Sequence, residues 1–117
     1  MHAEGDPARL LDMHQFAIDV RDFVAGRSYE QYVNDKMLRR AVERSIEIIG
    51  EAARNVSPAF QAAHPQVPWR LIVAQRHVLA HEYGEIKDER IWRVATVHIP
   101  ELIASLRGLI GPPPTLP

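Results

Sequence analysis

Apolar residues recur every three or four positions along nearly the whole chain, which is the spacing of amphipathic helices. The first run lies between residues 6 and 26, where we expect Asp6 to cap a helix, Pro7 to occupy its first turn and Gly26 to end it. The apolar positions of this run are Leu10, Met13, Phe16, Ala17, Val20, Phe23 and Val24. No segment alternates apolar and polar residues as a half-buried strand would, so the pattern predicts an all-α protein.

Further helical segments follow, separated by glycine and proline. We expect them at about residues 28–33, 35–55, 57–64, 68–82 and 88–109. Ser28 and Gln31 have the spacing of a capping box, and Asp88 is expected to cap the last segment. Pro100 lies inside that last pattern and predicts a kink or a short break near Val97.

These segments predict a single helical domain over residues 1–110, folded as an antiparallel bundle of four to five helices. A run of glycine and proline ends the last helix, and residues 111–117 are expected to form a Pro-rich C-terminal tail. The helices carry more apolar surface than a minimal core requires, including Phe60, Trp69 and Trp92. We therefore expect a homodimer formed through a pair of helices.

The composition excludes several kinds of site and location. The chain has 117 residues and no cysteine, which rules out disulfides, thiolate metal sites, iron–sulfur clusters and cysteine nucleophiles. No apolar stretch approaches the roughly 20 residues of a membrane-spanning helix, and the N-terminus lacks the apolar core of a signal peptide. We therefore expect a soluble cytoplasmic protein that has no association with a membrane.

Charge is distributed unevenly along the chain, although the formal net charge is −1. Residues 1–35 contain three basic and seven acidic side chains, whereas residues 36–76 contain seven basic and three acidic ones. Residues 77–117 contain four basic and five acidic side chains. The middle third could build a local positive surface on a nearly neutral molecule, or it could be a solvated helix face with ion pairs.

The most informative stretch runs from Arg76 to Tyr83, at the end of a predicted helix. Arginine offers a planar, permanently charged fork for phosphate oxygens, and histidine is the side chain whose ordinary pKa suits proton transfer near neutrality. At about 100° per residue, His77 and His81 share one helix face, while Arg76 and His81 diverge by about 140°. A site that uses both Arg76 and His81 therefore needs the helix to loosen at His81, or a cleft that wraps the helix end, such as a dimer seam.

Simpler interpretations of this stretch stay open. An arginine and a histidine at this spacing occur by chance in many helices. His77 and His81 could be two metal ligands, but a zinc site needs three or four, so we expect no metal site. Glu82 and Glu85 could act as bases, but exposed glutamates beside a lysine are typical of a solvated surface. Tyr83 could be a half-buried packing residue with its hydroxyl at the surface.

These residues also carry a resemblance to the HepT-like toxins of the HEPN superfamily. The family motif is an arginine, four residues, a histidine, one residue and a tyrosine, and Arg76, His81 and Tyr83 complete it. The resemblance covers about residues 10–109 and extends beyond the motif to Arg44–Asn55, His64–Arg70, Ile91–Trp92 and Pro100–Leu102. Two positions depart from the family pattern. His77 stands where asparagine is frequent, and Glu82 replaces a frequent glycine and adds negative charge where RNA would approach.

The resemblance implies a HEPN-like fold and a metal-independent endoribonuclease toxin. Such a toxin needs no cofactor and acts on RNA as a homodimer, with the two motif helices lining a shared cleft. His81 would act as general base on a ribose 2′-hydroxyl, and Arg76 would stabilise the charge that gathers on the phosphorane. His77 could position the phosphate or carry the second proton. The products would carry a 2′,3′-cyclic phosphate.

The resemblance also implies a protein partner, an MNT-type nucleotidyltransferase antitoxin. In the family this partner transfers adenylyl groups from ATP to the tyrosine that corresponds to Tyr83. This AMPylation would add an anionic phosphodiester and a nucleoside beside Arg76, which shares a helix face with Tyr83. We expect the modification to silence the site, although the sequence leaves open whether control is by adenylylation, by simple masking or by both.

Two other classes of function are compatible with the sequence. The first is a non-catalytic helical module that binds a nucleotidyltransferase or a nucleotide and cleaves nothing. It predicts complex formation that survives the loss of Arg76 and His81. The second is a structural helical dimer in which the polar motif only caps a helix.

Overall fold

The computed structural model describes residues 3–110, and within this range the chain forms helices and no strand. This confirms the all-α prediction, while the tail expected at residues 111–117 lies outside the described residues. None of the described helices is both long and apolar enough to cross a membrane. The helices are α1 (Asp6–Val24), α2 (Tyr29–Val33), α3 (Lys36–Arg54), α4 (Pro58–Ala63), α5 (Trp69–His81), α6 (Gly84–Arg93), a π-helical turn (Val94–His98) and α7 (Ile99–Ile110), preceded by a 3-10 turn (Ala3–Gly5).

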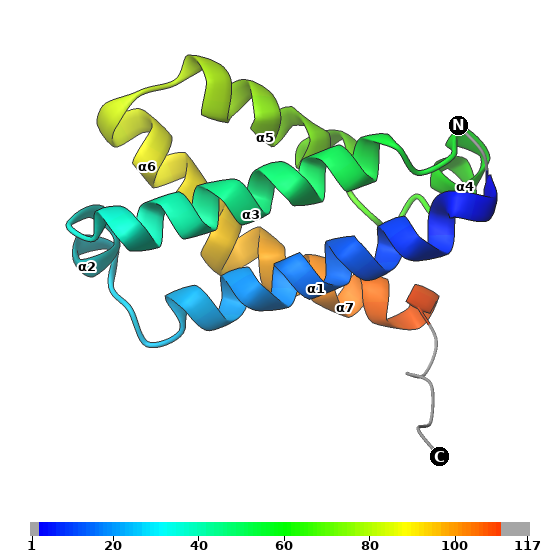
Figure 1. Cartoon of the computed structure of the whole chain (residues 1–117), viewed down its shortest axis with the longest axis horizontal. Coiled ribbons are helices and arrows are strands. Elements are labelled where there is room, and N and C mark those ends of the chain that lie inside the picture. The colour runs from blue at the N-terminus through cyan, green and yellow to red at the C-terminus, as the bar shows by residue number, and fades with distance from the viewer. Residues whose placement is uncertain (1–2, 111–117) are drawn as a thin grey trace.

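The long helices form the antiparallel bundle that the pattern predicted (Figure 1). α1 and α3 lie side by side and run in opposite directions, α5 packs along α3, and α7 packs along α1. α2 and α4 are short helices at the two ends of α3. The core is built from side chains of every long helix. Its fully buried members include Met13, Val20, Tyr32, Val42, Ile49, Ile91, Leu102 and Leu106.

Asp6 does not cap α1, which corrects the interpretation from the sequence. It is the first residue of the helix, and the N-cap position is occupied by Gly5, which makes no side-chain cap. The Asp6 carboxylate is buried and accepts hydrogen bonds from the backbone N–H of Ser57 at 2.8 Å and from the Ser57 hydroxyl at 2.6 Å. The carboxylate is satisfied by a residue distant in the sequence, and it joins the start of α1 to the start of α4.

α6 begins at Gly84, one turn before the start expected at Asp88. Gly84 has φ +62°, a left-handed conformation that glycine adopts without steric cost. The chain can therefore reverse directly after Tyr83 and enter the helix at once. Asp88 consequently lies inside α6 and caps nothing, because the glycine turn has already started the helix.

A π-helical turn joins α6 to α7, at the place where a break was predicted near Val97. Pro100 has no N–H to donate to a carbonyl in the preceding turn, and its ring would crowd that carbonyl in a regular helix. The wider π turn removes this conflict without ending the helix. The Thr96 hydroxyl donates to the Trp92 carbonyl at 2.8 Å within this turn. α6 and α7 thus form one bent segment that crosses the bundle (Figure 1).

Candidate functional site

The motif residues lie in the second half of α5 and in the loop that follows it. Arg76 and His77 are on the helix, His81 is its final residue, and Tyr83 precedes α6. All four side chains are exposed. The residues singled out from the sequence are therefore gathered at one end of one helix, on the surface of the molecule.

Arg76 is paired with a carboxylate of the neighbouring helix. Its Nη1 lies 2.9 Å from Oε2 of Glu51 on α3. The other carboxylate oxygen, Oε1, accepts hydrogen bonds from Arg54 at 2.9 Å and from the Asn55 amide at 3.2 Å. The hydrogen bond from Arg54 is the main cause that holds the pKa of Glu51 below its ordinary value, with smaller contributions from Asn55 and the charge of Arg76. Glu51 is therefore an ionised partner for Arg76 at neutral pH.

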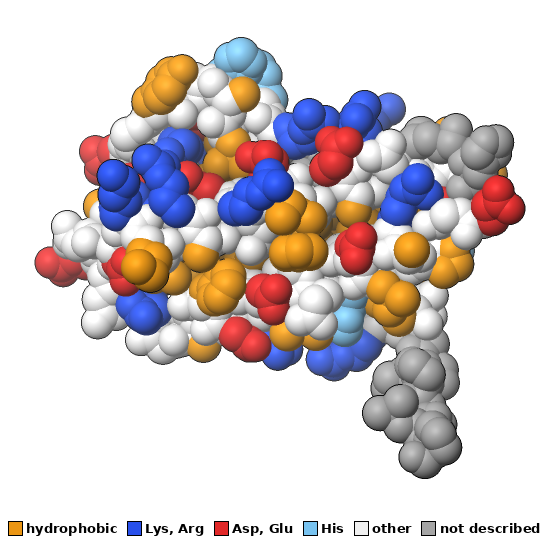
Figure 2. Space-filling view, in the orientation of Figure 1, with side chains coloured by type: hydrophobic (Ala, Val, Ile, Leu, Met, Phe, Trp, Pro, Cys, Tyr) orange, Lys and Arg blue, Asp and Glu red, His pale blue; other side chains and the backbone are white. Residues whose placement is uncertain are grey.

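Arg76 borders an open groove of about 540 Å³ between α1, α3 and α5. The groove is lined by Arg9, Asp12, Arg44, Glu47, Ile48, Glu51, Ala52, Asn55 and Arg76. On this face Lys and Arg side chains alternate with Asp and Glu side chains (Figure 2), and Arg44 pairs with Glu47 at 2.7 Å. Four basic residues of the middle third are paired with glutamates, as the simpler of the two interpretations expected: Arg40, Arg44, Arg54 and Arg76. Such exposed pairs contribute only about 0–1 kcal/mol each to stability.

The two histidines of the motif lie against each other on one face of α5. The ring centroids of His77 and His81 are 4.4 Å apart, as the four-residue spacing predicted. α5 stays helical through His81. The helix therefore does not loosen at His81, and Arg76 and His81 leave the helix in directions about 140° apart.

The sequence suggested that Glu82 presents its negative charge to approaching RNA, but its side chain is turned toward α6. Its carboxylate lies 3.1 Å from Nε of Arg90 on α6, and its side chain is only 25% exposed. The ion pair links the end of α5 to α6. The negative charge introduced at this position is thus balanced by Arg90 rather than presented alone to a nucleic acid.

Tyr83 is not a packing residue, because it is 77% exposed. The two other tyrosines are held by the fold. Tyr32 is fully buried, and the rings of Tyr29 and Tyr32 lie 6.1 and 5.2 Å from that of Trp92. Burial raises the pKa of the Tyr32 hydroxyl well above its usual range. Of the three tyrosines in the chain, Tyr83 is the one with an exposed side chain.

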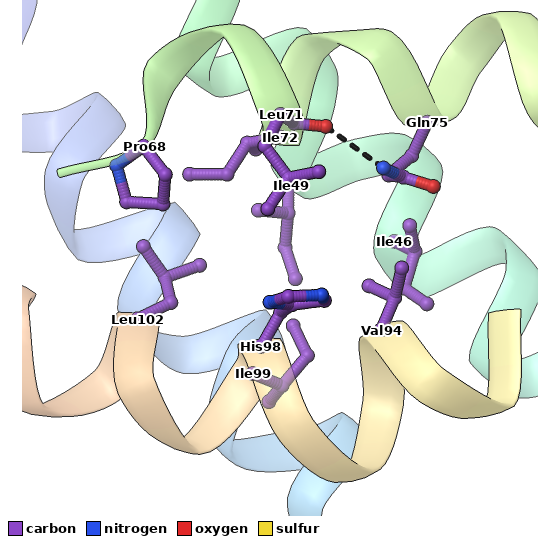
Figure 3. Close-up of a pocket in the computed structure, with 10 residues that line it drawn as sticks. All are labelled: Ile46, Ile49, Pro68, Leu71, Ile72, Gln75, Val94, His98, Ile99 and Leu102. Carbon is purple, nitrogen blue, oxygen red and sulfur yellow. Dashed lines mark hydrogen bonds between the residues drawn. The ribbon is translucent and has the colours of Figure 1, made fainter. Parts of the chain in front are cut away.

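The described part of the chain shows no metal-binding cluster at the motif, and the apolar cavity that α5 helps to line is small. Within residues 3–110, no three side chains among His, Asp and Glu gather closely enough to hold a metal ion. A small apolar cavity of about 20 Å³ lies between α3, α5 and the segment that contains the π turn (Figure 3). It is lined by Ile46, Ile49, Pro68, Leu71, Ile72, Gln75, Val94, His98, Ile99 and Leu102. A volume of this size holds about one water molecule, so this cavity is not a substrate site.

Two residues at the site were missed in the sequence. Neither Glu51 nor Arg90 is singled out by the sequence pattern. Several glutamates share the polar face of α3, and only the rotation of α3 against α5 decides which one meets Arg76. The ion pair of Arg90 likewise depends on how the chain turns at Gly84.

Comparison with known proteins decides the family. The sequence matches the Ribonuclease HepT-like family over residues 13–109, which includes the whole motif. The chain belongs to the HepT-like family. Its all-α bundle is accordingly of the HEPN type, and it is a HepT-like ribonuclease by family. No solved structure matches this HepT-like chain.

Several relatives of this HepT-like chain come from archaea and bacteria. The "Putative RNase MJ1380" of Methanocaldococcus jannaschii is 37% identical over 95 residues, which is 81% of this chain and 87% of that protein. The "Putative RNase TTE0752" of Caldanaerobacter subterraneus subsp. tengcongensis is 40% identical over 87 residues, or 74% of this chain and 78% of that protein. The "Probable ribonuclease HepT" of Thermococcus cleftensis is 34% identical over 83 residues, which is 71% of this chain and 76% of that protein.

Proposed function

We propose that this HepT-like chain is a metal-independent endoribonuclease and the toxin of a toxin–antitoxin pair. The observation that carries the proposal is the set of Arg76, His81 and Tyr83, all exposed at the end of α5, in a chain of the HepT-like ribonuclease family. An arginine and a histidine are sufficient for transesterification of RNA, because one stabilises charge and the other moves a proton. No cofactor is needed for this chemistry.

The reaction uses the ribose of the substrate as the nucleophile. His81 accepts the proton of the 2′-hydroxyl, the 2′-oxygen bonds to the adjacent phosphorus, and the bond from phosphorus to the 5′-oxygen of the next nucleotide breaks. Arg76 donates N–H groups to the phosphorane oxygens as their negative charge grows, and a donor of this kind contributes about 3 kcal/mol. The leaving 5′-oxygen takes up a proton, for which His77 is available beside His81. The products are a 2′,3′-cyclic phosphate and a 5′-hydroxyl.

The directions of Arg76 and His81 support a site shared by two copies of the chain. Because α5 is regular through His81, one helix does not present both side chains on one face. Two copies of α5 that line a common cleft can bring an arginine and a histidine to the same phosphate from different sides. The proposed active form is therefore a homodimer, which is a common assembly for a chain of this size.

The proposed control acts at Tyr83, through an MNT-type nucleotidyltransferase antitoxin. The exposed Tyr83 hydroxyl attacks the α-phosphorus of ATP, a tyrosyl–oxygen–phosphorus bond forms, and pyrophosphate leaves. The hydroxyl is accessible for this transfer, since the side chain is 77% exposed. The added phosphodiester is negative and the nucleoside is bulky, so both repel or block RNA at the end of α5.

Cleavage of RNA by the purified chain in EDTA tests the proposal. Mass spectrometry first establishes that Tyr83 is unmodified. The wild type should give products with 2′,3′-cyclic phosphate ends, and His81→Ala and Arg76→Ala should each lower the rate by about a hundredfold or more. Arg93→Ala removes an exposed arginine from α6 and should cleave like the wild type.

Two results would overturn the proposal. An unmodified, folded wild type that cleaves no RNA in EDTA is not a metal-independent ribonuclease. Binding of a nucleotidyltransferase that survives both substitutions, again without RNA turnover, would put a non-catalytic binding module in its place.

A further inference from the structure

The carboxylate of Glu51 is held at both of its oxygens by different helices. Oε1 accepts hydrogen bonds from Arg54, one turn along on α3, and from Asn55, which caps the end of α3. Oε2 lies 2.9 Å from Nη1 of Arg76 on α5. Because α3 fixes one oxygen, the other is aimed across the helix interface at a single nitrogen of Arg76.

The aliphatic part of the Arg76 side chain packs against Gly50, the residue before Glu51. A Cβ placed on Gly50 would lie 3.4 Å from Cγ and 3.8 Å from Cδ of Arg76, so the aliphatic part of the arginine passes directly over the glycine. Gly50 is buried between the helices. One turn of α3 therefore contacts both the aliphatic part and the guanidinium of Arg76.

The contact with Glu51 uses only a small part of the hydrogen-bonding capacity of Arg76. A guanidinium carries five N–H donors, and the ion pair with Glu51 engages one terminal nitrogen. The side chain of Arg76 remains 45% exposed at the edge of the groove between α1, α3 and α5. The other N–H groups of Arg76 thus remain available to a phosphate, while the contact with Glu51 orients the guanidinium plane.

We propose that Glu51 is a positioning residue, which orients the Arg76 guanidinium toward the phosphate that is cleaved. The inference rests on the proposed ribonuclease function. Misplacement of a charge-stabilising group by about 1 Å can lower a rate a hundredfold, so loss of this support acts on the chemical step more than on binding.

Glu47 provides a matched control for Glu51. It is one turn earlier on α3, lines the same groove and is 50% exposed, against 47% for Glu51. It pairs with Arg44 instead of Arg76. Glu47→Gln and Glu51→Gln therefore remove the same charge from the same groove, and only the second removes the contact with Arg76.

The experiment compares kcat and KM for an RNA oligonucleotide whose cleavage site by the wild type has been mapped. Glu51→Gln should lower kcat by about tenfold to a hundredfold and change KM by less than about threefold. Glu47→Gln should stay within about twofold of the wild type. In a protein that already carries Arg76→Lys, Glu51→Gln should lower kcat much less than it does in the wild type, because the guanidinium that Glu51 positions is already gone.

A measurement without activity accompanies the kinetics. The side-chain Nε–Hε resonance of Arg76 is identified by its absence in Arg76→Lys. It should move in Glu51→Gln and stay in place in Glu47→Gln, which shows whether the contact exists in solution.

The outcomes separate the two proposals. A wild type that cleaves RNA, together with a Glu51→Gln variant of equal or higher kcat, overturns the positioning role and leaves the ribonuclease intact. Equal losses in Glu51→Gln and Glu47→Gln also overturn it, since groove charge alone would then explain both. A wild type without cleavage overturns the ribonuclease and this inference together.

Discussion

Gly50 on α3 lies directly beneath the side chain of Arg76 on α5. A Cβ at position 50 would lie 3.2 Å from the carbonyl oxygen of Ile72 and 3.4 Å from Cγ of Arg76. The first distance is tighter than most van der Waals contacts and involves backbone, and the second lies at the lower limit of ordinary contact. The close approach of α3 and α5 at the motif thus depends on a position without a side chain.

Gly50→Ala should therefore destabilise the protein, although alanine favours a helix. The gain in helix propensity is about 1 kcal/mol, and crowding in a packed interface costs about 1–3 kcal/mol, so we expect a net loss of about 1 kcal/mol. Urea unfolding of the purified variant measures this difference. Cleavage should also fall, because Arg76 shifts with the displaced helix.

Gly108 on α7 is the control for this prediction. It lies in a helix, and nothing within 4 Å would meet a Cβ there. Gly108→Ala should stabilise the protein by up to about 1 kcal/mol. If both alanine variants were stabilised alike, the tight contact between α3 and α5 would be refuted.

Glu82→Gln should leave RNA cleavage within about twofold of the wild type. The carboxylate pairs with Arg90 and is turned toward α6, so its charge does not act alone on an incoming phosphate. The wild type and the variant are compared by initial cleavage rates at low and at moderate salt. A clear increase in rate for the variant at low salt would show that the charge of Glu82 does repel RNA.

Tyr83→Phe should leave RNA cleavage unchanged and abolish modification by the antitoxin. Phenylalanine keeps the ring but lacks the hydroxyl that would attack ATP. Intact-mass and peptide mass spectrometry after incubation with nucleotidyltransferase and ATP reads out the adenylyl group. Tyr32→Phe is the control, since Tyr32 is fully buried and should not be modified in the folded protein. An adenylylated and silenced Tyr83→Phe variant would contradict the assignment.

His14 should make the protein less stable in mild acid. Burial is the main cause that lowers the pKa of His14 below its ordinary 6.5, and the positive charges of Arg107 and Arg21 add to it. As the pH falls through about 6.5, the unfolded chain binds a proton that the folded chain does not yet accept, so the free energy of unfolding decreases. The loss is complete once the pH is below the lowered pKa of the folded state.

His14→Gln removes this titration and should flatten the dependence of stability on pH between about 7 and 5. Urea unfolding at several pH values compares the slopes for the wild type and the variant. Equal slopes in the two proteins would show that His14 has the same pKa in the folded and unfolded states.

Most of the helices could be predicted because their signals are local. Caps, breakers and apolar spacing involve residues within about one turn of each other, as at Ser28 with Gln31 or at Pro100 with its π turn. Arg76, His81 and Tyr83 were recognisable for the same reason, since their spacing is carried by one short stretch. The errors at Asp6 and Asp88 arose where a plausible local cap was overruled by a distant partner or by the turn at Gly84.

The chain alone thus specified an all-α bundle and three motif residues at the end of one helix. The packing of the helices decided which side chains meet across their interfaces. Ser57 donates hydrogen bonds to the Asp6 carboxylate, which lies 51 residues away in the sequence. Glu51 rather than Glu47 pairs with Arg76, and Arg90 pairs with Glu82. These pairings depend on the rotation and separation of packed helices, and the periodicity of one segment contains no information about either.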